Sequence, residues 1–274
     1  MQMGLSTTNR YQIHWRMPTH SMKTLIVTTI LCLAPLAVAT AQTCSKQSPA
    51  HTVALLELYT SEGCSSCPPA DHAISGLQQA ANSDLVVPLA LHVDYWDYIG
   101  WTDRFAKPDY AHRQQSLADA SGSRVIYTPE MFIGGRELRN WSDALPTSIG
   151  QVNRKPPQAS IGIKLGEVTG GKLPVEVNTK AAPGAKLFIA LYENGLSSNV
   201  KAGENSGVVL KHDYVVRDWI GPIALPNDAT GDNVASRALS VPTNSVSKQL
   251  GVAAFVQNKT GEVLQALALP YCGG

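Results

Sequence analysis

The residues with the clearest potential for chemistry are Cys64 and Cys67, which are separated by Ser65-Ser66 and followed by Pro68-Pro69. Two cysteines at this spacing can close a small disulfide ring and exchange it with the thiols of another protein. In such an exchange one sulfur attacks as a thiolate, and the second sulfur breaks the mixed disulfide that forms. We expect Cys64 to be the attacking thiol and Cys67 to be the resolving thiol.

The segments on either side of this motif predict a strand and a helix. Val53 to Tyr59 is an apolar run that is typical of a buried central strand. A helix is predicted over residues 70–81, because apolar side chains recur there at helical spacing. The N-terminus of a helix carries partial positive charge and unpaired N–H groups, which would lower the pKa of the Cys64 thiol.

The rest of the first half continues the alternation of strands and helices. Strands are predicted at Leu85 to Val93 and at Val125 to Arg136, and helices at Pro108 to Ala120 and at Trp141 to Val152. Extra residues near 94–107 form an aromatic-rich loop, either a rim that grips partners or a set of packing residues. The order βαβα followed by ββα predicts an α/β thioredoxin-like domain over residues 50–154.

A dithiol enzyme needs a proton carrier near its buried sulfur, and four side chains are candidates for it. They are Glu57 on the strand that leads to the motif, Asp71 on the helix after it, and His92 and Asp94 at the end of the second strand. Burial within an apolar run would raise the pKa of Glu57. The competing interpretation is that Glu57 and His92 are packed, hydrogen-bonded structural residues.

Two other kinds of chemistry compete with thiol exchange at the motif. Cys64, Cys67 and His92 offer soft ligands for copper or zinc, which predicts a metal carrier as an alternative. However, the chain has no second CxxC and no run rich in Met or His. The disulfide could also be a permanent staple in a non-catalytic envelope interaction module. For thiol exchange itself no cofactor is expected.

The N-terminus has the features of an export signal. Lys23 is followed by the apolar run Thr24 to Val38 and by Ala39-Thr40-Ala41, a small-x-small pattern that predicts cleavage before Gln42. Residues 1–41 are therefore assigned as a signal peptide with an over-long start, since Met22 is a better first residue. We expect a secreted or periplasmic protein that would touch a membrane only through an uncleaved signal.

Export would leave four cysteines in an oxidising compartment, which favours two disulfides. The short spacing favours Cys64–Cys67 among the three possible pairings, so Cys44 and Cys272 would form the second bond. A bond between the two ends of the mature chain would stabilise it by about 4–5 kcal/mol in the chain-entropy model.

The second half of the chain has a different sequence pattern. After the linker at residues 154–157, short alternating strands separated by Gly and Pro turns predict an all-β immunoglobulin-like sandwich domain over residues 155–274. No catalytic constellation stands out there. Charge is nearly balanced, with 22 basic and 21 acidic residues and no basic stripe, so nucleic-acid binding is not expected.

Several blocks of the chain resemble the DUF1223 family of exported bacterial proteins. The matching blocks are Leu56 to Asp71, Leu91 to Asp97 with Gly100-Trp101, Tyr127-Thr128-Pro129, Gly203-Glu204-Asn205 and Val215-Val216-Arg217. The resemblance covers nearly the whole mature chain and implies a thioredoxin-like first half. Because the family carries an unknown-function label, the resemblance supports a fold more than a reaction.

The resemblance also implies a role for Thr128-Pro129. Thioredoxin-like folds place a cis-proline opposite the CxxC, and the residue before it offers backbone groups to an extended substrate. Pro129 has the order along the chain that this role requires, and an ordinary trans proline at a strand start is the alternative. The expected partners are cysteine-containing exported proteins or a redox partner.

Overall fold

The computed structural model describes residues 12–17, 44–226 and 233–273. The signal peptide predicted over residues 1–41, with its cleavage site, therefore lies outside the described residues apart from 12–17. Within these ranges no helix is both long and apolar enough to cross a membrane.

Eight strands form one mixed sheet in the order β14-β13-β8-β11-β3-β2-β4-β5. Their bounds are Ala54–Thr60 (β2), Val86–His92 (β3), Glu130–Ile133 (β4), Arg136–Glu137 (β5), Lys186–Glu193 (β8), Val215–Ala224 (β11), Leu250–Gln257 (β13) and Val263–Pro270 (β14). β3 pairs in parallel with β2 on one side and with β11 on the other, and the remaining pairs are antiparallel. The sheet therefore runs across both halves of the chain.

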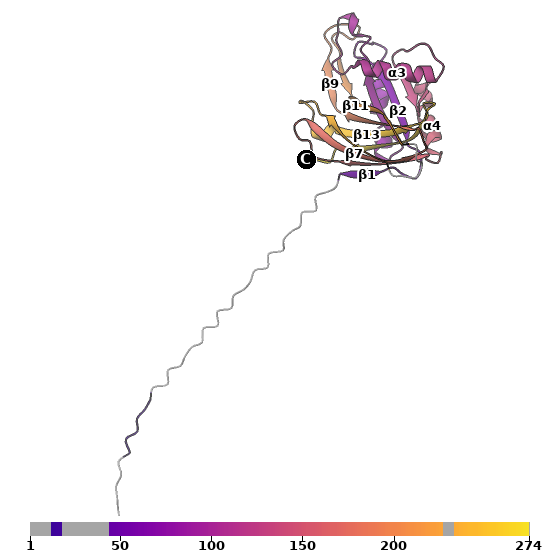
Figure 1. Ribbon diagram of the computed structural model, residues 1–274. Helices are drawn as coiled ribbons and strands as arrows, with labels where there is room; N and C mark the ends of the chain where they lie inside the picture. The colour runs from indigo at the N-terminus through magenta and orange to yellow at the C-terminus, as the bar shows by residue number, and fades with distance from the viewer. Residues whose placement is uncertain (1–11, 18–43, 227–232, 274) are drawn as a thin grey trace, which may run out of the picture. The chain divides into compact units, whose positions relative to one another are not determined.

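Two smaller sheets accompany it. The first has the order β1-β6-β7-β12, with bounds Ser45–Gln47 (β1), Ala159–Leu165 (β6), Lys172–Ala181 (β7) and Asn233–Ser240 (β12). It lies against one side of the large sheet, where β6 contacts β13 and β14 and the apolar side chains of the two sheets share a core (Figure 1). The second is the hairpin of Leu196–Asn199 (β9) and Val209–His212 (β10).

Four α-helices are described: Pro68–Ser75 (α1), Gln78–Asn82 (α2), Pro108–Ala120 (α3) and Trp141–Asn153 (α4), with short 3-10 turns at Asp97–Ile99 and Ser247–Gln249. The helix predicted over 70–81 is divided in two, since α1 ends at Ser75 and α2 begins at Gln78. The predicted strand over 125–136 is also shorter, because residues 124–128 lie outside any strand.

The side chains of β8 point alternately to the two faces of the large sheet, and this explains how the two halves of the chain join. Leu187, Ile189 and Leu191 pack into a core shared with the four-stranded sheet. The intervening Phe188, Ala190 and Tyr192 pack into the other core, together with the helices and with β2 and β3. A strand that buries both faces sits inside a layered structure, so β8 connects the two cores.

The predicted fold class, an α/β thioredoxin-like domain followed by an immunoglobulin-like sandwich, is wrong. The protein is mostly β, and strands β2 to β5 of the first half belong to the same sheet as β8, β11, β13 and β14 of the second. The physical reason is the parallel pairing of β11 with the free edge of β3. An unpaired strand edge is a liability, and here a strand more than 120 residues further along the chain covers it.

The ends of the described unit are tied together. Cys44 lies just before β1, and Cys272 lies just after β14. A disulfide joins these two cysteines across a sequence separation of 228 residues. The described residues from Cys44 onward form one compact unit by their contacts. The predicted boundary at residue 154 falls between α4 and β6 of this unit.

Candidate functional site

The CxxC closes a disulfide between the end of β2 and the start of α1. Cys64 and Cys67 are bonded to each other, with their Cα atoms 5.4 Å apart, and both residues are fully buried. Ser65 and Ser66 between them are exposed. The Oγ of Ser66 lies 3.4 Å from the Sγ of Cys64, within hydrogen-bond distance of sulfur.

The start of α1 offers fewer free N–H groups to the sulfurs than the sequence suggests. Pro68 and Pro69 carry no N–H group, and the N–H groups of Ala70 and Asp71 both donate to the carbonyl of Cys67. The expectation of unpaired backbone donors at this helix terminus is therefore wrong for the first turn. The Ser66 hydroxyl remains as a polar neighbour of Cys64.

A loop between β9 and β10, residues 200–208, covers the disulfide ring. The side-chain amide of buried Asn205 donates to the carbonyls of Glu62 and Cys64, at 2.9 and 3.0 Å. The carboxylate of Glu204 accepts from the N–H and the hydroxyl of Ser65, at 3.0 and 2.7 Å. We call residues 203–205 the cover segment, because these bonds hold it over the ring.

The peptide bond between Thr128 and Pro129 is cis and leads directly into β4. β4 is antiparallel to β2 with Glu130 opposite Tyr59, so the same register brings Pro129 level with Thr60. Trp96 connects this turn to the motif, because its indole N–H donates to the hydroxyl of Thr128. Its Cβ also lies close beside Gly63, where an added Cβ would meet it at 3.2 Å.

Next to α1 lies a buried cluster of ionisable side chains from three elements, which we call the cluster beneath the ring because Asp71 follows Cys67 by four residues on α1. Asp71 of α1, His92 of β3 and His212 of β10 place one donor atom each within 4.8 Å of one another. Asp103 lies 2.7 Å from Nδ1 of His92, and Glu62 lies 3.3 Å from Nε2 of His212. All five side chains are nine-tenths or more buried.

The surroundings shift the pKa values of this cluster in opposite directions. Burial raises the pKa of Asp71, although His212 and His92 oppose it. Burial would lower the pKa of His92, but the charge and hydrogen bond of Asp103 raise it overall. Despite burial, the pKa of Asp103 is lowered by His92, and that of Glu62 is lowered by the adjacent imidazole of His212.

The sequence model of the family described as "Protein of unknown function (DUF1223)" matches residues 55–257. The chain belongs to the DUF1223 family. The match spans the CxxC, the cis-proline and the cover segment, so the resemblance inferred from those blocks is confirmed.

Two solved structures are similar to this DUF1223 protein. The crystal structure of protein AGR_C_4864 from Agrobacterium tumefaciens is 25% identical with a TM-score of 0.59, covering 82% of this chain and 98% of that one. HBP35 of Porphyromonas gingivalis is 16% identical with a TM-score of 0.62, covering 81% and 76%. The second likeness concerns the fold alone. No curated protein matches the sequence.

The structure brings only some of the predicted site residues together. Asp71 and His92 join the cluster beneath the ring, while Asp94 is half-buried and outside it. Among the described residues, His92 is grouped with Asp71 and His212, not with the two sulfurs proposed as its metal-binding partners. Glu57 points to the opposite face of β2, where Arg113 of α3 holds both of its oxygens at 3.0 and 3.1 Å.

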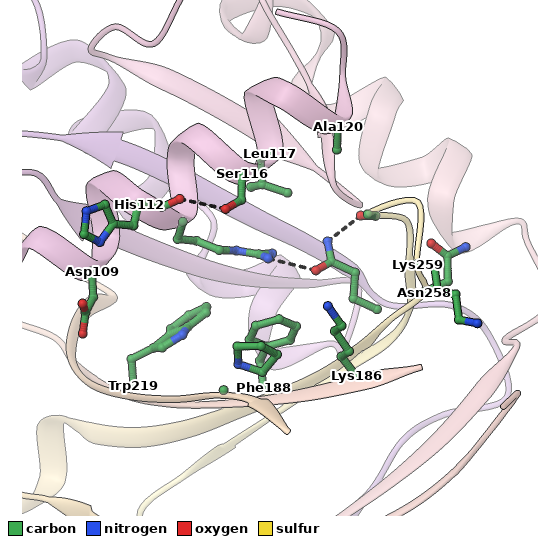
Figure 2. A pocket seen from close by; sticks show the side chains of 15 residues that line it. Asp109, His112, Ser116, Leu117, Ala120, Lys186, Phe188, Trp219, Asn258 and Lys259 are labelled. Carbon is green, nitrogen blue, oxygen red and sulfur yellow. Dashed lines mark hydrogen bonds between the residues drawn. The ribbon is translucent and has the colours of Figure 1, made fainter. Parts of the chain in front are cut away.

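Arg113 also lines a cavity of about 450 Å³ between α3 and strands β8, β11 and β13, and neither cysteine of the motif is among the lining residues. Figure 2 shows His112 and Ser116 of α3 on one side of it, and Phe188, Trp219 and Lys186 on the other. The guanidinium stacks over Phe188 and donates to Gln257, so it is fully engaged within the wall. This cavity and the disulfide ring are therefore separate features of the DUF1223 protein.

Sequence reasoning did not assign roles to four residues of the site: Glu62, Asp103, Asn205 and His212. The Gly203-Glu204-Asn205 block was visible as part of the family resemblance, and it is the signal that pointed there. Of the loop aromatics, Trp101 donates to Glu62 and Tyr95 to Gln114, whereas Tyr98 is 83% exposed.

Proposed function

We propose that this protein is an exported thiol–disulfide exchange protein that acts on cysteine-containing partners through Cys64 and Cys67. The observation that carries the proposal is a CxxC disulfide at the start of α1, a few residues after the end of β2, which lies beside a cis-proline. A second observation supports it: the side chains of Glu204 and Asn205 supply the described hydrogen bonds between the cover segment and residues 62–65 at the ring.

The exchange is a balanced two-electron reaction. A thiolate of the partner attacks Sγ of Cys64, the bond to Cys67 breaks, and the electron pair leaves on Cys67 as a thiolate. A second partner thiolate then attacks the partner's own sulfur in the mixed disulfide and releases Cys64 as a thiolate. The partner is oxidised to a disulfide, the protein's pair is reduced, and the two protons of the partner thiols are available to the two cysteines. The reverse sequence reduces a partner.

Because both sulfurs are buried, the cover segment must move before a partner can reach Cys64. Loops with few apolar contacts and exposed hydrogen bonds open at a low free-energy cost. Glu204 and Ser65 are exposed, and their bonds compete with water. We therefore place the opening of residues 203–205 before the chemical step.

The second candidate is a non-catalytic envelope interaction module with a permanent Cys64–Cys67 staple. The burial of both sulfurs is the observation that favours it. The reduction potential of the pair distinguishes the two, because structural disulfides have potentials below about −300 mV. A more oxidising value, together with mixed disulfides trapped by Cys67→Ser but not by Cys64→Ser, supports exchange. A value well below about −300 mV refutes it.

A further inference from the structure

The buried cluster beneath the ring has the donor set of a metal site. Asp71 offers a carboxylate oxygen, and His92 and His212 each offer an imidazole nitrogen, all within 4.8 Å of one another. They come from α1, β3 and β10, elements that are far apart in sequence, so the fold assembles the group. Two imidazoles and one carboxylate suit zinc and other divalent transition metals, often with a further position open.

The nitrogen atoms that would bind the ion have no hydrogen-bond partner among the described residues. His92 is bonded at Nδ1 to Asp103, which leaves Nε2 unpartnered in a fully buried side chain. Neither ring nitrogen of His212 makes a hydrogen bond, although Nε2 lies 3.3 Å from Glu62. Unpaired buried polar atoms are costly, so these nitrogens need a partner of some kind.

Each imidazole also has a carboxylate behind it, as metal-binding histidines commonly do. Asp103 accepts the Nδ1 proton of His92 and so directs the lone pair of Nε2 toward Asp71 and His212. Asp103 is itself held in place by the backbone N–H groups of Glu62 and Phe105. Glu62 plays the corresponding part for His212 and is anchored by the indole N–H of Trp101.

The negative charge of the cluster also favours a bound cation. Asp71, Asp103 and Glu62 bring three carboxylates into the interior, and the described ion pairs join no lysine or arginine to any of them. With neutral imidazoles the cluster would carry three uncompensated negative charges, which is unfavourable in a buried site. A divalent cation at this position would offset two of the three negative charges.

We propose that Asp71, His92 and His212 form a binding site for a divalent transition-metal ion of the zinc class. In a tetrahedral site with zinc–ligand distances near 2.1 Å, two ligand atoms lie about 3.4 Å apart. The three donor atoms here lie within 4.8 Å of one another, so the widest pair would approach by up to about 1.4 Å when zinc binds. Neither sulfur is a ligand, and the inference does not depend on thiol exchange. Because His212 ends β10, the ion would also tie the covering hairpin to β3 and α1.

The test is titration of the oxidised, metal-free protein with Zn²⁺, with calorimetry as the readout and metal analysis after gel filtration as the stoichiometry. We expect one ion per chain, and at least a hundredfold weaker binding in Asp71→Asn, His92→Gln and His212→Gln. His72→Gln is the matched control, since His72 is the exposed neighbour of Asp71 on α1, and it should bind as the unaltered protein does. The Cys64→Ser/Cys67→Ser variant should also retain binding.

A direct measurement keeps the test decisive if a ligand variant fails to fold. X-ray absorption at the zinc edge of the unaltered protein should give nitrogen and oxygen neighbours including two imidazoles, and no sulfur. The absence of stoichiometric binding would overturn the proposal, as would a sulfur ligand. Binding lost in the double cysteine variant but kept in His212→Gln would also overturn it, in favour of a site on the sulfurs.

Discussion

The cover segment makes a quantitative prediction about how fast the disulfide can be reduced. Asn205 is buried, and its amide donates to the carbonyls of Glu62 and Cys64. Asn205→Ala removes both hydrogen bonds. At about 1 kcal/mol for each, the closed position of the segment loses about 2 kcal/mol relative to the open one. Since 1.4 kcal/mol corresponds to a factor of ten, the open population rises about 25- to 30-fold.

The assay is the rate of reduction of the Cys64–Cys67 bond by a small phosphine under native conditions, followed by alkylation and mass spectrometry. If opening is fast and precedes attack, the rate is proportional to the open population, so the variant should be reduced about 25- to 30-fold faster. Ser206→Ala is the neighbouring control. Its hydroxyl donates only to Lys201 at an exposed position, so its rate should stay near that of the unaltered protein.

A second control separates local opening from global unfolding. Val177→Ala removes methyl groups from a fully buried position of β7, in the core shared with the four-stranded sheet. This variant lowers the overall stability without touching the cover segment. We expect an unchanged reduction rate. Equal rates for Asn205→Ala and the unaltered protein would refute the gating argument, and acceleration by Val177→Ala would show that reduction follows global unfolding.

Three other perturbations have definite expected outcomes. Removing the Cys44–Cys272 bond by a double Ser substitution should lower the free energy of unfolding by up to about 5 kcal/mol in urea titrations, because the closed loop is long. Burial raises the pKa of Glu130 to about 7, so the folded state prefers the protonated form of this carboxyl. The free energy of unfolding should therefore fall as pH rises from about 4.5 through about 7. Glu130→Gln should remove this pH dependence from thermal melts. Glu57→Ala leaves the buried guanidinium of Arg113 unpaired and should cost about 3–5 kcal/mol in urea, without altering the reduction rate of the CxxC bond under native conditions.

Each of these outcomes has a comparison that can contradict it. Glu167→Gln alters an exposed carboxylate and should leave the pH slope intact, so a slope lost there would discredit the assignment to Glu130. A reduction rate that changes strongly in Glu57→Ala would return Glu57 to the list of proton carriers. Unchanged urea stability after loss of the Cys44–Cys272 bond would mean that the termini are held by packing alone.

Much of the local structure was predictable because its signals are local. The apolar run before the CxxC forms β2, and the spacing after Pro108 forms α3 over the predicted residues. The division of the predicted helix over 70–81 shows the limit of periodicity. Apolar side chains recur at helical spacing over residues 70–81, yet the helix is interrupted at Gly76, because tertiary packing outweighs a weak helix propensity.

The candidate site was predictable only where its residues are close in sequence. Cys64, Cys67 and Asp71 fall within eight consecutive positions, so spacing alone suggested their relation. His92 was a candidate because it ends a predicted strand. His212 and Asn205 lie about 140 residues beyond the motif, on a hairpin that had been assigned to a separate domain. No local pattern indicates that such residues meet, because their contact depends on strand pairing between distant segments.

The sequence by itself therefore determined the chemical types at the motif, the strand and helix that flank it, and membership of the DUF1223 family. Only the tertiary structure decided that β11 pairs with β3, so that both halves share a sheet. The same pairing brings the β9–β10 hairpin over the disulfide and its histidine beneath it. The physical reason is that side-chain spacing reports which faces are buried, whereas the burying partner is selected by packing across the whole molecule.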